Sequence, residues 1–534
     1  MTVITPYRSE LRPGRDGFVQ TLHAEWTKFR TVRGWVIGMV VAVVVAAGIG
    51  LLTTGSTSSY CQHVGGGPAR SGASCLPPFS LGPGGEPVTD SFYFVRQPLT
   101  GNDSITVRVT SLTGLLPPPN GPQGPGPGDT RPGLEPWAKA GIIIKQDLNQ
   151  GSRYAAMMVA ADHGVRMQWN YTADTPGLSG AAGQKSPRWL RLTRSGDVIT
   201  GYDSADGTRW TAVGTVTLSG LPRVVQAGLF AASPDYTVVS QSFGGTSSTG
   251  GGPTQATAVI DHVSRSGGWQ NGTWTGEYIG AAEAPSGGGY HQAGSRFTVT
   301  GSGDIAPIAE GHGGPLDPAL TVTDYLLGTF AGLITIAVVA TMFITAEYRR
   351  SLIRATLAAS PRRGRVLAAK AIVIGAVSFV AGLAGAAAAV LIGAAITHAR
   401  GYYEFPVPWP TELRVIIGTG ALLAVSAVLA LAVGTVVRRS AAAVVIVIVT
   451  IVLPYFLAVA SVLPLGVSDW LLRITPAAGF AVQQAYPQYA QVTALYSPLS
   501  GYFPLASWAG FAVLCAWAAV ALAGAAFLLR RRDA

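Results

Sequence analysis

The sequence predicts a polytopic α-helical membrane protein with six transmembrane helices and an inserted extracellular all-β sandwich domain. Three observations lead to this fold class. Six apolar runs are as long as the roughly 18 to 20 residues that a helix needs to cross a bilayer. Residues 55–320, between the first and second runs, contain no such run. Short alternating strands and turn signals fill much of that interval instead.

The distribution of charge predicts the orientation. The chain has 534 residues, with 37 Lys and Arg against 27 Asp and Glu, and a net charge of +10. Residues 55–320 hold 16 basic and 18 acidic residues, so the basic excess lies beside the apolar runs. This is typical of a membrane protein and argues against nucleic acid as a partner. Because Lys and Arg in short loops stay cytoplasmic, we expect a multi-pass plasma-membrane protein with both termini in the cytoplasm.

Residues 1–33 are predicted to be a cytoplasmic N-terminus with an amphipathic helix in the membrane interface. Trp26 and Phe29 fall on one arc of a helical wheel, and Lys28 lies beyond its edge. Such a helix suits the bilayer surface, with Trp26 at headgroup depth. Glu25 also falls within the apolar arc and does not fit this interpretation. The alternative is that the segment is only the cytoplasmic end of the first span.

The first span is predicted at residues 34–54. A cleavable signal peptide is the competing interpretation, but the apolar part and the basic lead are both too long for one. A Gly-, Ser- and Pro-rich linker follows at residues 55–89, where Cys61 and Cys75 flank a short loop. In an extracellular segment we expect these cysteines to form a disulfide, the alternative being two free thiols.

The interval after the linker is predicted to be rich in β-structure. Residues 90–245 contain many short runs that alternate apolar and polar residues, which predicts a two-sheet sandwich. Residues 246–320 are Gly- and Ser-rich with isolated strands, and we expect a second β-region or a return linker there.

The remainder of the chain is predicted to hold five spans. They lie at residues 321–345, 366–398, 413–437, 441–463 and 507–529. Residues 346–365 form a cytoplasmic loop, and residues 464–506, too polar for a full span, form an outer re-entrant or surface hairpin. With Lys370 counted in the central loop, the cytoplasmic segments of this topology hold eighteen Lys and Arg. The two short outer segments hold three, namely Arg400, Arg414 and Arg473. Reversing the topology would reverse that asymmetry.

The loop at residues 346–365, AEYRRSLIRATLAASPRRGR, is basic and amphipathic. Leu352, Ile353 and Leu357 recur at helical spacing, while Arg350 and Arg354 lie four residues apart on another face. One interpretation is a loop that only sets topology. The other is a short helix that binds a cytosolic partner.

The stretch TAEYRRSLIRATLAASPRRGRVLAAKAIVIG resembles the first cytoplasmic loop of type-2 ABC exporter permeases, in their actinobacterial form. The resemblance covers residues 18–54 and 321–530. It implies a permease subunit that moves a substrate outward with a separate cytosolic ABC ATPase, as a permease homodimer or heterodimer in the lipid bilayer. It also implies an interfacial elbow helix that contains Trp26, Lys28 and Phe29. The residues that it assigns to ATPase coupling are Glu347, Arg350, Leu352, Ile353, Arg354, Leu357 and Pro361.

The segment WAKAGIIIKQDLNQGSRYAAMMV and the strands after it resemble concanavalin A-like lectin and glucanase domains. This implies a glycan or cell-wall ligand for the outer domain. The Glu/Asp/Glu strand motif of the glucanases is absent, and Asp203 and Asp206 occur in a hairpin turn, where aspartate serves the backbone. His163 and His262 lack metal-ligand spacing, so we expect neither a catalytic nor a metal site. The tryptophans either stack on sugars or pack in the core.

The chain contains no GxxxxGK[ST] phosphate loop, so we expect no cofactor in it, with ATP and Mg²⁺ bound by the partner ATPase. No Asp, Glu or His lies deep within a predicted span, which argues against an ion relay. We therefore expect a transport subunit and not an enzyme. The alternative function is a membrane-anchored cell-wall or glycan-binding protein without transport activity.

Overall fold

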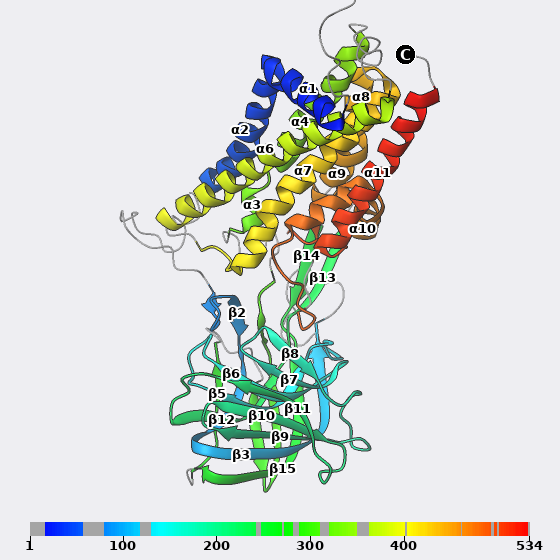
Figure 1. The fold of residues 1–534 in the computed structure, drawn as a ribbon. Helices are drawn as coiled ribbons and strands as arrows, with labels where there is room; N and C mark the ends of the chain where they lie inside the picture. The colour runs from blue at the N-terminus through cyan, green and yellow to red at the C-terminus, as the bar shows by residue number, and fades with distance from the viewer. Residues whose placement is uncertain are drawn as a thin grey trace, which may run out of the picture.

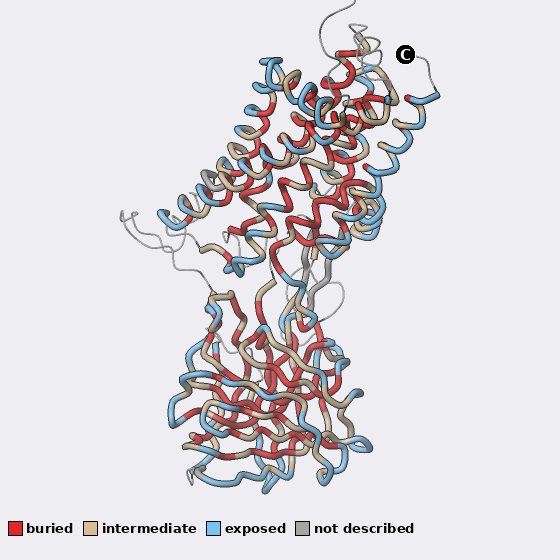
Figure 2. The backbone as a smooth tube through the Cα atoms, viewed as in Figure 1, coloured by how far each residue is buried: buried red, intermediate tan, exposed pale blue. Residues whose placement is uncertain are grey.

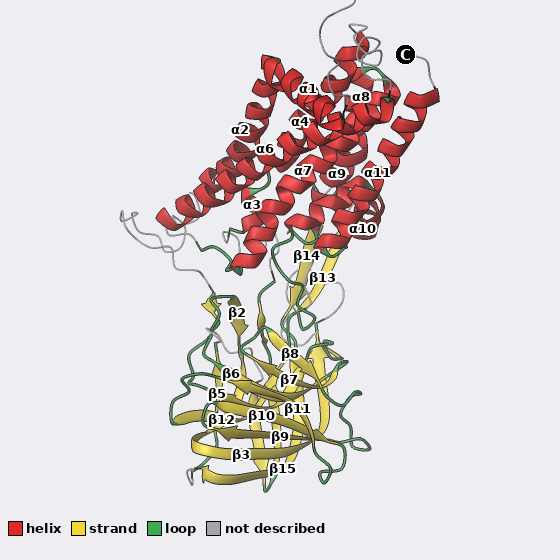
Figure 3. Ribbon diagram, viewed as in Figure 1, coloured by secondary structure: helices red, strands yellow, loops and turns green. Residues whose placement is uncertain are grey.

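The computed structural model has a helical part and an all-β part arranged end to end (Figures 1 and 3). The chain begins in the helices, passes through the β part and returns to the helices. The structure describes residues 17–56, 79–117, 130–241, 247–269, 272–280, 288–309, 320–349, 362–400, 403–460, 462–492, 496–498 and 501–531.

In these described residues, six helical segments are long and apolar enough to cross a membrane. The prediction of six such segments is confirmed. They are α2 (Arg33–Ser56), α3 and α4 (Val322–Tyr325 and Thr329–Arg349), α6 (Arg363–Ala399), α7 (Trp409–Val437), α8 to α9 (Ser440–Val447 and Leu453–Val459) and α11 (Ser507–Arg531).

The backbone of the helical part is irregular at two places. Between α8 and α9 the helix widens to a π-helix, η2 (Ile448–Val452), directly before Pro454. Proline lacks an N–H and clashes with the preceding turn, and the wider turn accommodates it. At the N-terminus, the short α1 (Phe18–Thr31) is separated from α2 by Val32, whose φ of −86° and ψ of 96° are extended. The chain therefore changes direction between α1 and the first long helix.

The segment predicted as an outer hairpin, residues 464–506, contains α10 (Leu465–Ile474) and the 3₁₀-helix η3 (Pro476–Gln483). Every residue of η3 is buried, because it packs against α7 and α11. The Gln483 amide donates to the hydroxyls of Thr329 and Thr419, each at 3.0 Å. This buried side chain thus joins η3 to α4 and α7 inside the bundle.

The β part is built on one long strand. Its elements are β1 (Ser80–Leu81), β2 (Pro87–Asp90), β3 (Phe92–Leu116), β4 (Arg131–Pro132), β5 (Lys139–Lys145), β6 (Tyr154–Ala160), β7 (Gly164–Trp169), β8 (Ala173–Pro176), β9 (Arg188–Ser195), β10 (Val198–Ser204), β11 (Thr211–Thr217), β12 (Val224–Ala232), β13 (Tyr236–Gln241), β14 (Ser247–Gly252), β15 (Gln255–Trp269), β16 (Thr275–Ile279), β17 (Gly289–Ala293), β18 (Arg296–Gly301) and β19 (Ile305–Pro307). The hairpin of β13 and β14 rises from this part toward the helices (Figure 1).

Strand β3 takes part in two layers. Residues 92–100 pair with β12 and β16, and β12 continues through β5, β6 and β7 to β8. Residues 103–109 pair with β9, which continues to β10 and β11. The two layers pack over a shared apolar core that includes Ile142, Met157 and Leu190 (Figure 2). Strands β5 and β6 are buried along their whole length, and their sequences are accordingly apolar apart from the two lysines at the ends of β5.

The boundary predicted at residue 245 does not exist in the structure. Strand β15 pairs with β3 over most of its length, and β16, β17 and β18 belong to the same sheet system. Arg108 of β3 and Asp261 of β15, 153 residues apart, form a bidentate ion pair at 2.7 and 2.8 Å. Residues 246–320 therefore do not form a separate β-region or linker, because their strands complete the sandwich.

A small sheet connects the sandwich to the helices. Strand β2 pairs with β1 and with β19, so the chain enters and leaves the sandwich side by side. Two buried lysines of β5 hold this neck. Lys145 lies 2.6 Å from Asp90 at the end of β2, and Lys139 lies 2.6 Å from Asp304 directly before β19.

Candidate functional site

Helix α1, which carries Trp26, Lys28 and Phe29, and the last turn of α4 lie at the end of the helical bundle that points away from the β part (Figure 1). Glu347 is in the last turn of α4, three residues before the segment 350–361, which the structure does not describe. Six of the predicted coupling residues lie outside the described residues: Arg350, Leu352, Ile353, Arg354, Leu357 and Pro361. Cys61 and Cys75 also lie outside them, so the predicted disulfide stays a prediction.

Four charged side chains form a closed ring at this end of the bundle. The Lys370 ammonium of α6 lies 2.6 Å from Glu25 and 2.8 Å from Glu347. The Lys28 ammonium of α1 lies 2.8 Å from Glu25 and 3.2 Å from Glu347. Acids and bases alternate around the ring, so its formal charges cancel. It joins three helices that are distant in the sequence.

This ring is mostly shielded from solvent. The side chain of Lys370 is 0% exposed, that of Glu25 2% and that of Glu347 8%, whereas Lys28 keeps 39%. Burial lowers the pKa of Lys28, but its hydrogen bond to Glu25 and the charge of Glu347 outweigh this, and the pKa is raised. Lys28 therefore stays charged at neutral pH. Among the described residues, Glu347 Oε2 has no hydrogen-bond partner.

An aromatic cluster packs beside the ring of charged side chains. Phe29 of α1 is buried, with its ring centroid 6.1 Å from Trp35 and 5.8 Å from Phe343. Phe343 also lies under the Lys370 ammonium, at 4.5 Å. Trp26, 6.5 Å from Phe29, keeps 44% of its surface exposed. The α1 helix is thus attached to α2 and α4 by one apolar contact and to α4 and α6 by the charges.

The two ends of the 350–361 segment are held by different helices. On the α4 side, the guanidinium of Arg438, in the turn after α7, lies 5.2 Å from the Tyr348 ring. On the α6 side, Arg363 donates to the carbonyl oxygen of Leu529 near the end of α11, at 2.8 Å. The residues on either side of this segment therefore contact α7 and α11 as well as the ring.

The structure brings together two predicted residues, Lys28 and Glu347, that the sequence assigned to different elements. It also adds two that sequence reasoning missed. Glu25 appeared as a misfit within an apolar arc, and Lys370 was counted only as a loop charge. A signal was present, because a carboxylate on an apolar helix face and a lysine at the start of an apolar span both need a buried partner of opposite charge.

The β part shows no catalytic or metal-binding arrangement among its described residues. Asp206 accepts hydrogen bonds from the N–H groups of Arg209 and Thr208, which hold the pKa of its carboxyl below the usual range. Asp203 accepts from the Leu178 N–H. Asp206 therefore stabilises the turn, whereas Asp203 lies within β10 and holds the chain that follows β8. In the described part of the chain, no group of three or more His, Cys, Asp or Glu side chains could hold a metal ion.

Several tryptophans of the β part have one ring face covered. Trp137 stacks on His163 with centroids 3.8 Å apart. The Arg191 guanidinium lies 3.9 Å from the Trp210 ring, and the Arg108 guanidinium lies 5.6 Å from that of Trp189. These contacts favour a packing role, since the covered faces are not available for stacking on a sugar ring.

Comparisons with curated proteins and with solved structures show no strong likeness. No curated protein matches the chain. A functionally unknown protein from Saccharomyces cerevisiae is similar in structure, with a TM-score of 0.21 and 14% identity over 33% of this chain and 74% of that one. Scytalido-glutamic peptidase has a TM-score of 0.23 and 10% identity over 41% of this chain and 100% of its own. These low scores assign no fold to the β part.

The family comparison covers the greater part of the chain. Residues 153–534 match the model of the ABC-2 family transporter proteins. The match begins at β6, runs through the rest of the sandwich and includes every long helix except α2. The chain therefore belongs to the ABC-2 family of transporter proteins.

Proposed function

We propose that this chain is the permease subunit of an ATP-driven exporter, and that a separate ATPase subunit binds the segment from Glu347 to Pro361. The observation that carries the proposal is the charge ring, which fastens the α4 end of this segment to α1 and α6. A movement imposed on the segment by an ATPase would pass directly into three helices. The exporter resemblance of the same residues points in the same direction.

The orientation follows from the charges. The end of the bundle that bears the ring also bears Arg438, Arg439 and the arginines at the end of α11, and we place it in the cytoplasm. The β part then lies outside the cell. Both termini lie inside, and ATP and Mg²⁺ belong to the partner. Two permeases and two ATPases would complete the transporter, as a homodimer or heterodimer of permeases.

The outer β part is open to more than one use in this proposal. A concanavalin A-like sandwich that binds a glycan, a receptor for cargo and a lid over the helices are all compatible with its position. A membrane-anchored glycan-binding protein without transport activity is the competing function. The presence or absence of an ATPase partner separates these two functions, because a glycan receptor needs none.

The decisive experiment is purification of the full chain from native membranes in mild detergent. We expect a co-purifying ATPase with a GxxxxGK[ST] loop and ATP hydrolysis by the complex. The double variant Leu352→Asp/Leu357→Asp should lose the ATPase, because an apolar anchor at an interface typically contributes about 2 kcal/mol or more and a buried unpaired charge costs further. Its amount in the membrane should not change.

The matched control replaces two exposed apolar residues of the β part, Leu115→Asp and Val198→Asp. This variant should keep the ATPase. A wild-type chain that purifies without any ATPase would refute the exporter function. If the ATPase binds equally well to the Leu352/Leu357 variant, the segment is only a topology signal.

A further inference from the structure

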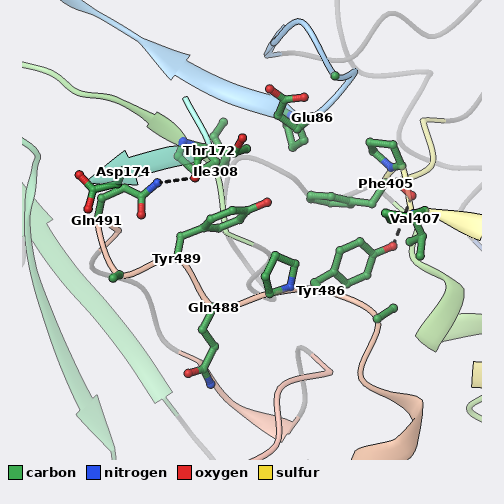
Figure 4. A pocket seen from close by; sticks show the side chains of 18 of the residues that line it. Glu86, Thr172, Asp174, Ile308, Phe405, Val407, Tyr486, Gln488, Tyr489 and Gln491 are labelled. Carbon is green, nitrogen blue, oxygen red and sulfur yellow. Dashed lines mark hydrogen bonds between the residues drawn. The ribbon is translucent and has the colours of Figure 1, made fainter. Parts of the chain in front are cut away.

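A cavity of about 830 Å³ lies where the β part meets the helices. Most of its walls come from four segments: the neck turn around Glu86, the β7–β8 region around Thr172, the loop before α7 around Phe405, and the segment after η3 around Tyr489. Pro307 and Ile308 at the end of β19 and Tyr502 before α11 complete the lining. Figure 4 shows Phe405, Tyr486 and Tyr489 on one side of this space and Glu86 at its edge, with the carboxylate of Glu86 beside its own turn. The volume is within the range of cavities that bind small molecules, about 300–1,000 Å³.

The lining of this cavity is aromatic, and the rings are held in place. Phe405 and Tyr486 are buried, with centroids 5.2 Å apart, and the Tyr486 hydroxyl donates to the Phe405 carbonyl oxygen. Tyr403 packs on Phe405 and donates to the Gly85 carbonyl oxygen at 2.6 Å. The Tyr496 hydroxyl donates to the carbonyl oxygen of Tyr489 at 2.9 Å and fixes its backbone. The walls are therefore pre-formed.

Glu86 is the charged residue of this lining whose carboxylate has no cation beside it among the described residues. The other carboxylate of the cavity, Asp174, is neutralised by the Arg166 guanidinium and also accepts from Gln168. Arg153, in the adjoining cavity, donates to Gln146 instead. Among the described residues, no cation pairs with the Glu86 carboxylate. Burial raises the pKa of Glu86, against the opposing effect of hydrogen bonds that its carboxylate accepts from the N–H groups of Glu86 and Gly84.

The turn that carries Glu86 holds it at this place. The Gly82 N–H donates to the Glu86 carbonyl oxygen at 2.7 Å, and the Gly85 N–H donates to the Gly82 carbonyl oxygen at 3.0 Å. Gly85 has a φ of +83°, a conformation that glycine adopts without strain. This short turn precedes β2, which Lys145 fastens to the sandwich. The carboxylate is therefore positioned by the fold and is not a mobile surface charge.

We propose that this junction cavity binds a small hydrophobic organic cation, with Glu86 as its counter-ion and the rings of Phe405, Tyr486 and Tyr489 around it. A cation against aromatic faces gains from their negative quadrupole, and a half-buried carboxylate without a counter-ion gains from a cation beside it. An anion would meet the negative charge of Glu86. A neutral ligand would leave that carboxylate with only its backbone hydrogen bonds. The site thus selects for positive charge.

Such a ligand would touch both parts of the molecule at once. Gln491, which lines the cavity, donates to the carbonyl oxygens of Tyr171 and Thr172 in the β part, each at 3.2 Å (Figure 4). Binding would therefore hold the β part against the loops at the adjacent ends of the helices. This inference does not depend on the ATPase partner, because it concerns binding to the isolated chain.

The test is equilibrium dialysis of the full chain in detergent with tetraphenylphosphonium, whose charge is permanent. Tetraphenylborate has the same shape and the opposite charge. We expect saturable binding of the phosphonium and at least tenfold weaker binding of the borate. Glu86→Gln should weaken phosphonium binding at least tenfold, because it keeps the shape and removes the charge. Tyr489→Ala should weaken it several-fold, whereas Tyr489→Phe keeps the ring and the affinity.

The matched control is Asp469→Asn, which removes a carboxylate from the neighbouring cavity beside α10 and should leave the affinity unchanged. Acidification gives a second control. Protonation of Glu86 should release the cation as pH falls through its raised pKa, and Glu86→Gln should abolish that dependence. The neighbouring hydroxyls of Tyr403 and Tyr489 stay neutral, since burial raises the pKa of each. Asp174, the other carboxylate of the lining, is present in both proteins, so a dependence that it causes would persist in Glu86→Gln.

Three results would overturn the proposal. The phosphonium does not saturate the wild-type chain, the borate binds as tightly as the phosphonium, or Glu86→Gln binds with native affinity. In the last two cases the cavity is only an apolar space without charge selection. Circular dichroism and thermal unfolding of each variant establish that it is folded, so a loss of binding is not a loss of structure.

Discussion

Lys370 is the residue on which the closed ring at the end of the bundle away from the β part depends. Its ammonium contacts both carboxylates of the ring, and its side chain has no exposed surface. Removing Lys370 would leave two buried carboxylates with a single cation between them, and a buried charge that is only partly compensated costs several kcal/mol. Lys28 contacts the same two carboxylates but remains partly in water.

We predict that Lys370→Met destabilises the full chain by about 3–5 kcal/mol, the cost of breaking a buried ion pair. Lys28→Met, the control, removes a partly exposed lysine and should cost about 1 kcal/mol or less. Denaturant-induced unfolding in detergent measures both. Adding Glu25→Gln to Lys370→Met should recover part of the loss, because Lys28 then balances the single remaining carboxylate, Glu347. Equal effects of the two lysine variants would contradict this account of the ring.

At the scale of elements, β5 acts as the connection between the neck and the sandwich. It carries a buried lysine at each end, and these reach the two aspartates that flank the neck strands β2 and β19. Lys145 also lies 3.3 Å from the Tyr171 hydroxyl, which itself donates to Asp90 at 2.7 Å. Burial lowers the pKa of Lys145, although the nearby Asp90 charge opposes this. The contact between Lys145 and Asp90 therefore depends on hydrogen-bond geometry as well as on charge.

We predict that Lys145→Met loosens the neck more than it disturbs the rest of the sandwich. Asp90 would keep its bonds to Tyr171 and the Gly151 N–H but lose its cation. Hydrogen–deuterium exchange of the full chain should increase in β2 and β19 by at least tenfold, with little change in β9 and β10. Lys185→Met, on an exposed lysine of the same part, is the control. Uniform acceleration across the sandwich would argue against a local clamp.

At the scale of the whole molecule, the two parts differ in what they require of their surroundings. The long helices present apolar side chains outward, among them Val44, Val380 and Leu391, each more than 60% exposed. The β part instead presents mainly polar turns and buries its apolar residues in its own core. The helical part needs a bilayer around it, and the β part needs water.

We predict that the β part faces outward and the segment 350–361 faces the cytoplasm. In a chain without Cys61, Cys75 and Cys515, a cysteine at Thr208 should react with an impermeant thiol reagent in intact cells. A cysteine at Ser351 should react only after the cells are permeabilised. Labelling of Ser351→Cys in intact cells would contradict this orientation. Thr208 is suited to the comparison because it is exposed in a turn of the β part.

The sequence by itself determined the long helices and many of the strands. Apolar length and alternation are local properties, so the spans and the strands β9, β10 and β11 follow from residues close together in the chain. It also pointed to the α4 end as functional, through Glu347, and to α1, through Lys28.

Tertiary structure alone decided how these pieces combine. Residues 246–320 were predicted to be a β-region or a return linker, because the residues near them in the sequence do not show what they pair with. Their strand β15 pairs with β3, which lies far away in the sequence. Glu25 appeared to be a misfit because its partner, Lys370, is 345 residues distant. The junction cavity, with its walls from several segments, has no sequence signature at all. In each case the stabilising partner is non-local, and whether a charge or a strand edge is satisfied depends on a neighbour that only the fold supplies.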